Sequence, residues 1–167
     1  MTDRQTHDAA APDPRLTVLA SRFPDAEFSD SFGQAVCRVP RETLVEFLTS
    51  SVAEGFGLFV DLCAVDYLHR DPRFEVVVNL VALDPPGRLR ILVGVPGEDP
   101  AMPSITGVLH GANFYEREAF DLFGIDFVGH PDLTRILLPD DWVGHPLRKD
   151  AVVGSVPVQF KGANTAR

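Results

Sequence analysis

The chain has few cysteines, and they do not form a metal-binding motif. Cys37 and Cys63 are the only two among 167 residues, and neither belongs to a CxxC pair. A disulfide framework, a zinc knuckle or an iron–sulfur cluster would need more ligands or closer spacing. Both cysteines lie in apolar stretches, so we expect each to be a small buried hydrophobic side chain.

The sequence also lacks the marks of a membrane span, a secretory leader and a nucleic-acid-binding surface. No apolar run approaches the roughly 20 residues of a membrane helix, and MTDRQTHDAAAPDPR at the start contains no apolar signal core. Acidic residues number 24 against 15 basic ones, giving a net charge of −9 without a basic stripe. We expect no nucleic-acid partner, no direct membrane insertion, and a cytoplasmic location unless a partner holds the chain at a membrane.

Familiar catalytic motifs are missing as well. There is no nucleophile elbow, no GxGxxG and no phosphate loop ending in Gly-Lys-Ser/Thr. The composition is that of a globular domain, with 45% hydrophobic and 23% charged residues. We expect a disordered tail over residues 1–14, one domain over 15–150, and a C-terminal tail over 151–167.

Apolar periodicity gives the expected elements. We predict helices over 15–23, 40–55, 104–109 and 113–124, and strands over 34–39, 57–65, 73–83, 88–95 and 125–128. The run 57–65 is apolar enough to be buried on both faces. The short turn at 84–87 implies that its flanking strands pair antiparallel. The pattern predicts a two-layer α+β domain, with a mixed, mostly antiparallel sheet and helices packed on it.

The helix predicted over 113–124 begins a stretch rich in both charge and aromatic side chains. Asn113 and Glu116 have the spacing of a capping box, and Gly124 is placed to end the helix. Arg117 and Asp121, four residues apart, are expected to pair along the surface for about 0.3–0.5 kcal/mol. One face is assigned to the core: Tyr115, Ala119, Leu122 and Phe123.

The flanks of this helix carry Phe114 and Phe120 beside acidic residues. Aromatic side chains next to charges favour a protein interface, whereas a plain amphipathic helix with a broad core face is the alternative.

His130 and His145 each follow a glycine and precede a proline. With Asp132, Asp140 or Asp141 they could form a two-histidine, one-carboxylate metal site or an acid–base pair. Their spacing matches no helical ligand pair, so we favour hydrogen bonds to local backbone. Among the basic residues, Arg135 lies between apolar neighbours, which predicts a structural ion pair.

The residues of this stretch resemble a known family. The segments that carry the resemblance are Glu116-Arg117-Glu118, Asp121 to Ile125, Phe127, Gly129 to Leu133, Arg135-Ile136-Leu137 and Gly144 to Asp150, with support upstream from Leu62 to Tyr67, the strand at Phe74, and Pro103 to Thr106. Over roughly residues 35–150 the chain resembles the 30-kDa subunit of respiratory complex I, which in bacteria is the C subunit of NADH-quinone oxidoreductase. It departs from the family at Thr134, usually arginine, and at Phe114, commonly tryptophan. The first change suggests that a local ion pair is absent or replaced.

The resemblance implies a small domain in the peripheral arm of a proton-translocating NADH:quinone oxidoreductase, on the cytoplasmic side of the membrane. It implies no cofactor and no catalytic residue on this chain, with FMN, iron–sulfur clusters and quinone on partner subunits. The expected partners are the 49-kDa-type subunit and the cluster-bearing subunits, in a hetero-oligomer. The tail 151–167, rich in valine, would be an extended docking segment.

The residues expected to serve folding and docking are called the signature residues: Glu116, Arg117, Glu118, Asp121, His130, Arg135, His145, Arg148, Lys149 and Asp150. Two alternatives stay open. One is the equivalent subunit of a membrane-bound hydrogenase or of a dehydrogenase fed by ferredoxin or a deazaflavin. The other is a free-standing metal hydrolase using His130 and His145.

Overall fold

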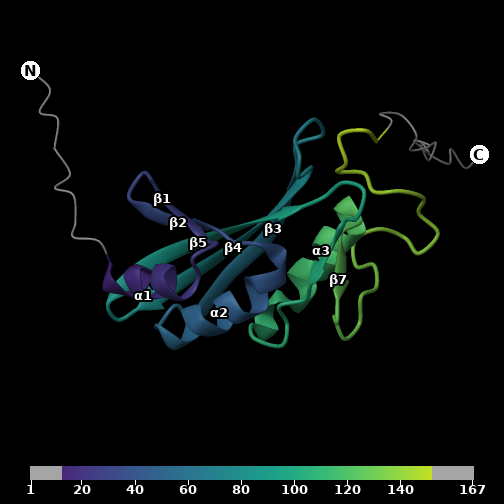
Figure 1. Ribbon diagram of the computed structural model, residues 1–167. Helices are drawn as coiled ribbons and strands as arrows, with labels where there is room; N and C mark the ends of the chain where they lie inside the picture. Colours follow the sequence, from purple (N-terminus) through teal and green to yellow (C-terminus); the bar gives the residue numbers. More distant parts are fainter. Residues whose placement is uncertain (1–12, 152–167) are drawn as a thin grey trace, which may run out of the picture.

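A five-stranded sheet carries the helices on one of its faces (Figure 1). The computed structural model describes residues 13–151. The helical elements are α1 (Pro14–Arg22), η1 (Arg41–Thr43), α2 (Leu44–Ala53), η2 (His110–Ala112) and α3 (Asn113–Phe123). The strands are β1 (Glu27–Ser31), β2 (Gln34–Arg38), β3 (Leu58–Asp66), β4 (Phe74–Leu83), β5 (Pro86–Val95), β6 (Ala101–Pro103) and β7 (Asp126–Val128).

The strand order is β1-β2-β5-β4-β3. β1 pairs antiparallel with β2, β4 with β5, and β3 with β4, whereas β2 and β5 are parallel. β6 and β7 form a separate parallel pair. The predicted two-layer α+β fold with a mixed, mostly antiparallel sheet is confirmed, as is the antiparallel pairing across the turn at 84–87.

The core lies between the sheet and the helices. Alternation along the two central strands sends every second side chain inward. The buried members are Phe74, Val76, Val78, Leu80 and Ala82 of β4 and Leu89, Ile91, Val93 and Val95 of β5. Leu19 of α1 and Leu44, Phe47 and Leu48 of α2 meet them from the helical layer.

β3 is an edge strand, which corrects the expectation that it would be buried on both faces. Within residues 13–151 no strand pairs with its outer side, and Leu58, Val60 and Cys63 are exposed. The prediction of a buried Cys63 is therefore wrong. Cys37 is buried as predicted, and burial raises the pKa of its thiol to about 12.

Other local predictions also differ from the structure. Residues 104–109 form turns instead of a helix. Strand β1 has too little apolar character to be predicted, and β6 has only 3 residues. Helix α1 begins at Pro14, one residue before the predicted helix, with the Asp13 carboxylate accepting from the amide of Arg15 at 3.0 Å. Residues 1–12 and 152–167, which hold the rest of the two predicted tails, lie outside the described residues.

Candidate functional site

Two acidic side chains of α3 are completely buried. Glu116 and Asp121 are enclosed, although the same helix exposes Phe114 and Glu118 to solvent. A buried carboxylate is costly unless donors satisfy its oxygens. The hydrogen-bond partners of these two acids therefore show which segments of the chain the helix holds in place.

Glu116 holds the segment that precedes the helix. Its Oε2 accepts from the Ser104 hydroxyl at 2.7 Å and its Oε1 from the amide of Ile105 at 2.6 Å. Burial raises the pKa of Glu116 above its ordinary value, although these two donors favour the carboxylate. The predicted capping box with Asn113 is wrong, because the carboxylate goes to buried donors from another segment and no side chain caps the helix.

Asp121 holds the segment that follows the helix. Its Oδ1 accepts from Arg135 at 2.6 Å. Its Oδ2 accepts from the amides of Ile136, Leu137 and Leu138 at 3.2, 2.9 and 2.9 Å. Burial alone would raise the pKa of Asp121, but the backbone donors and the guanidinium outweigh burial and lower it. The predicted structural ion pair of Arg135 is confirmed, and its carboxylate belongs to the same chain.

This arrangement overturns the predicted surface pair of Arg117 with Asp121. Arg117 instead donates to the carbonyl and the hydroxyl of Thr134, at 3.1 and 2.8 Å. Thr134 thus supplies neutral acceptors at the start of the segment that Asp121 holds in place.

The C-terminal end of α3 is closed by side chains from the chain that follows. Gly124 ends the helix with φ of 69°, as predicted. His145 donates from Nδ1 to the Asp121 carbonyl at 2.9 Å, and Arg148 donates to the carbonyls of Phe123 and Gly124. These bonds satisfy carbonyls that a helix end leaves unpaired, and the guanidinium complements the negative end of the helix dipole.

A second anchor joins the end of this segment to the sheet. Arg73 binds Asp66 at 2.7 Å and Asp150 at 2.8 Å, while the Lys149 amide donates to Asp66 at 2.8 Å. The Arg73 guanidinium and the backbone donors hold the pKa of Asp66 well below its usual range. Residues 134–151, here called the C-terminal segment, are therefore fixed both to α3 and to the β3–β4 connection.

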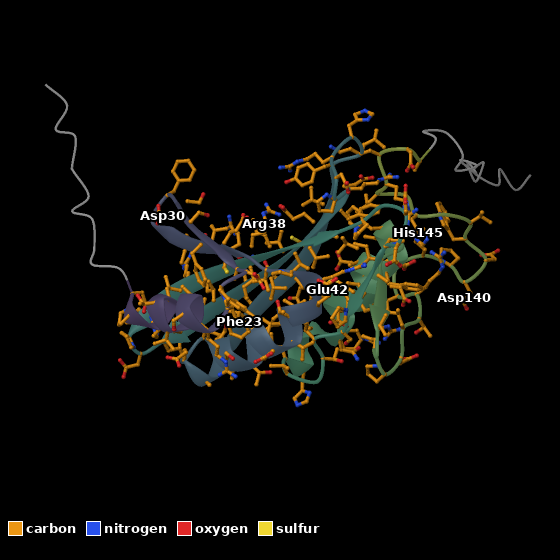
Figure 2. The ribbon with its side chains drawn as sticks, viewed as in Figure 1. Phe23, Asp30, Arg38, Glu42, Asp140 and His145 are labelled. Carbon is orange, nitrogen blue, oxygen red and sulfur yellow. The ribbon has the colours of Figure 1, made fainter. Side chains whose placement is uncertain are left out.

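The predicted histidine roles are partly confirmed. His130 accepts from the Asp132 amide at Nδ1 (3.0 Å), which is local backbone, and its Nε2 lies 3.2 Å from the Asn113 carbonyl. His145 also binds a backbone carbonyl, but that of Asp121 on α3, which is 24 residues away in the sequence. Across residues 13–151 no group of three or more His, Cys, Asp or Glu side chains is placed to hold a metal ion. In Figure 2, His145 lies beside α3 whereas Asp140 lies on the outer side of the C-terminal segment.

The core face of α3 is narrower than predicted. Ala119 is buried, but Tyr115 is exposed and Leu122 and Phe123 are only half-buried. Phe120, expected on a flank, packs against the core, and Phe114 is exposed. The helix instead buries two acids, Glu116 and Asp121, outside the predicted apolar face.

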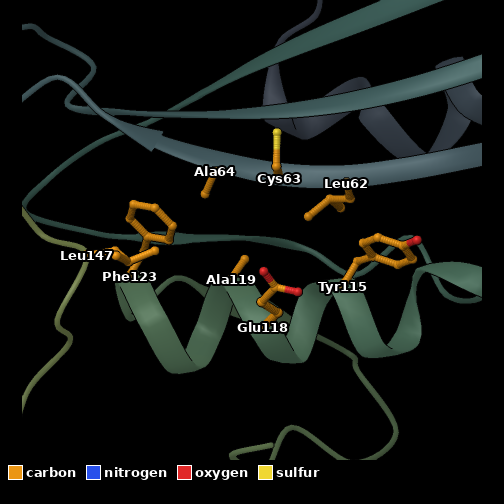
Figure 3. Close-up of a pocket in the computed structure, with 8 residues that line it drawn as sticks. All are labelled: Leu62, Cys63, Ala64, Tyr115, Glu118, Ala119, Phe123 and Leu147. Carbon is orange, nitrogen blue, oxygen red and sulfur yellow. The ribbon is translucent and has the colours of Figure 1, made fainter. Parts of the chain in front are cut away.

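A small pocket lies between β3 and α3. Figure 3 shows Leu62 and Ala64 facing α3, while the Cys63 sulfur points away from it. Tyr115, Glu118, Ala119, Phe123 and Leu147 complete the lining. Its volume of about 200 Å³ is below the range of roughly 300–1,000 Å³ typical of ligand sites. The pocket is a small, mostly apolar hollow beside the C-terminal segment, which contributes Leu147.

Apolar side chains face outward around this region. The exposed ones are Phe114, Tyr115, Val128, Leu137, Val143 and Leu147, with Val143 95% exposed. The charged signature residues are mostly turned inward, whereas the side chains of Glu118, Lys149 and Asp150 are exposed. Sequence reasoning missed Ser104, Asp66 and Arg73 as anchors. An acid ending an apolar strand was the available signal for Asp66.

The fold and the site define a class of protein: a small α+β domain in which one charged helix fixes a long irregular segment. Residues 37–156 match the family model described as respiratory-chain NADH dehydrogenase, 30 Kd subunit. The chain belongs to this family, as its motifs suggested.

Individual relatives support the same family membership. The C subunit of NADH-quinone oxidoreductase from Roseiflexus sp. (strain RS-1) is 50% identical over 150 residues, covering 87% of this chain and 86% of the relative. The same subunit from Herpetosiphon aurantiacus is 42% identical over 145 residues, covering 85% of each chain. A trypsin-resistant fragment (1–134) of Nqo5 has a TM-score of 0.65 at 38% identity, covering 71% of this chain and 99% of the fragment.

A more distant structure shows how widely the fold occurs. A chain of the membrane-bound sulfane sulfur reductase, described as an archaeal respiratory membrane complex, has a TM-score of 0.68 at 23% identity, covering 75% of each chain. At this identity the likeness concerns the fold alone. The named relatives at 42–50% identity are subunits of NADH-quinone oxidoreductase.

Proposed function

We propose that the chain is a structural, cofactor-free subunit of the peripheral arm of a proton-translocating NADH:quinone oxidoreductase. It docks on the 49-kDa-type and cluster-bearing subunits, on the cytoplasmic side of the membrane. FMN, the iron–sulfur clusters and quinone are bound by those partners, so no residue of this chain takes part in electron transfer.

One observation carries the docking part of this proposal: signature charges bind inside the chain while apolar side chains around them face outward. The signature residues Asp121 and Arg135 form an internal pair, and the signature residue Asp150 binds Arg73. Val143 and Leu147 lie on the segment that these pairs hold, and both are exposed. An apolar surface on a rigidly held segment is typical of a protein interface and would otherwise face water.

The tail 151–167 extends this proposed interface. It carries Val152, Val153, Val156, Val158 and Phe160 and follows directly on Asp150, which Arg73 anchors to the sheet. We expect the tail to lie extended over a partner subunit. Deleting residues 151–167 should lower the amount of assembled complex, and assembly at the normal level would contradict this role.

Membrane association is proposed to come through the partners. Within residues 13–151 no helix has both the length and the apolar character required to cross a bilayer. The net charge of −9 gives the chain little attraction to anionic lipid headgroups.

A second candidate keeps the architecture and changes the electron donor. The fold also occurs in the sulfane sulfur reductase complex, so the fold alone does not distinguish NADH from another donor. An equivalent subunit of a membrane-bound hydrogenase, or of a dehydrogenase fed by ferredoxin or a deazaflavin, would have the same core and different companions.

The test is an affinity purification of the tagged full-length chain from gently solubilised native membranes. Co-purifying proteins are identified, NADH:quinone activity is assayed, and metal and flavin are measured in the separately purified chain. Recovery of flavin and iron–sulfur subunits with activity, and a chain free of metal and flavin, is the expected result. A hydrogenase-type set would favour the second candidate. A chain recovered alone from the soluble fraction, with bound metal, would favour the hydrolase that uses His130 and His145.

A further inference from the structure

The hairpin between β1 and β2 has an unusual residue at its tip. Ser31 pairs with Gln34, which leaves Phe32 and Gly33 as a two-residue loop. Their φ values are 54° and 78°. Two successive positive φ values in a two-residue hairpin define a type I′ turn, in which Asn-Gly, Asp-Gly and Gly-Gly are preferred.

Phenylalanine does not suit this position. A bulky L-residue in the left-handed region is sterically unfavourable, and asparagine tolerates that region far better. Phe32 is also 106% exposed, so its ring gains no burial against the described part of the chain. Neither backbone preference nor packing within residues 13–151 accounts for an aromatic side chain here. The hairpin is otherwise well formed, with the Gly33 amide donating to Asp30 at 3.0 Å.

The surroundings of Phe32 are acidic. Glu27 and Asp30 are exposed on β1, and Asp30 lies near the tip of the hairpin (Figure 2). Arg38, the only base of β1 and β2, lies at the other end and binds Glu75 at 2.8 Å. An apolar ring with acidic neighbours is repelled by an anionic lipid surface. It suits an apolar protein pocket with a basic rim.

We infer that Phe32 is an anchor side chain that inserts into an apolar, basic-rimmed pocket of a neighbouring subunit. This inference rests on the proposed function, which supplies the neighbour. β1 lies at one edge of the sheet and β3, which packs beside α3, at the other. Figure 1 shows the β1–β2 hairpin well away from the C-terminal segment. The hairpin tip is therefore a second contact point, separate from the signature region.

The first test uses a substitution that separates binding from folding. Phe32→Asn creates the preferred sequence of a type I′ turn, so the purified chain should keep or raise its melting temperature. Leu83→Asn, at another exposed apolar side chain, is the matched control. Each tagged full-length chain is mixed with membranes lacking the native chain, and retention of the other subunits is titrated. Phe32→Asn should weaken retention by about tenfold or more, equivalent to about 1.4 kcal/mol, whereas Leu83→Asn should not.

The second test identifies what the ring contacts. A photoreactive benzoylphenylalanine placed at position 32 keeps an aromatic side chain and is irradiated in the assembled complex. The expected product joins this position to a peptide of another subunit that contains apolar and basic residues. Cross-links to lipid or to a second copy of this chain would overturn the inference, as would equal retention of Phe32→Asn and wild type. Should the wild-type chain recover no other subunit, the proposed function itself fails and this inference fails with it.

Discussion

Asp121→Ala is predicted to be among the most damaging single changes in the chain. The carboxylate is completely buried, binds Arg135 at 2.6 Å and accepts three backbone amides from residues 136–138. Removing one partner of a buried ion pair typically costs about 3–5 kcal/mol, because the other charge is left uncompensated. Arg135 is partly accessible to water, so we expect about 3 kcal/mol of unfolding free energy to be lost, the lower end of that range.

The assay is urea unfolding of the purified full-length chain, with hydrogen exchange read at the amides of residues 136–138. Asp121→Asn keeps an acceptor oxygen but loses the charge, and should cost about 1.5–3 kcal/mol. Glu118→Ala, on the exposed side of the same helix, is the control and should stay within about 0.5 kcal/mol of wild type. Asp121→Ala should also remove exchange protection at residues 136–138.

The pH dependence gives an independent check on Asp121. Its pKa is lowered in the folded chain, so the unfolded state binds a proton more readily and the stabilisation is present above the ordinary pKa of 3.8. It is lost as pH falls through the folded pKa, and the gap between wild type and Asp121→Asn should narrow there. Two results together would refute this account. Asp121→Ala would have to cost less than about 1 kcal/mol, which is below the cost of one unsatisfied buried group, and residues 136–138 would have to keep their exchange protection.

Three further changes test the neighbouring anchors. Gly124→Ala should cost at least about 1–2 kcal/mol in urea unfolding, because φ is positive and the new Cβ would collide with His145 and Arg148. Asp150→Asn should cost less than about 1 kcal/mol, since that carboxylate is 52% exposed. The pKa of Glu116 is raised in the folded chain. Its contribution to stability is therefore present below the ordinary value of 4.5 and is lost as pH rises through the folded pKa. Over that rise, wild type should lose stability relative to Glu116→Gln.

The central part of the fold follows from local pattern. The alternation in 73–83 and 88–95, with a short proline- and glycine-containing turn between them, defines a hairpin whose inward side chains make the core. Gly55 and Gly124 follow apolar helical runs, and both adopt positive φ beside the helix ends. In such places propensity, periodicity and turn chemistry agree, so the sequence is sufficient to predict the element and where it ends.

The remainder depends on contacts between distant parts of the chain. The apolar run of β3 looks the same whether the strand is central or at an edge, and only the strand order exposes Leu58 and Cys63. Glu116 and Asp121 read as surface acids on a helical wheel, because their donors lie in other segments. Arg135 was recognisable as needing a carboxylate, although its partner was not identifiable.

The most direct test of a structural, non-catalytic role is to measure assembly and turnover separately for Arg135→Ala in cells that lack the native chain. Loss of this guanidinium leaves Asp121 buried without its cation and should loosen the C-terminal segment. We predict less assembled complex in the membrane, with wild-type turnover and quinone KM for each complex that remains. A normal amount of complex with an altered KM for quinone would contradict the account.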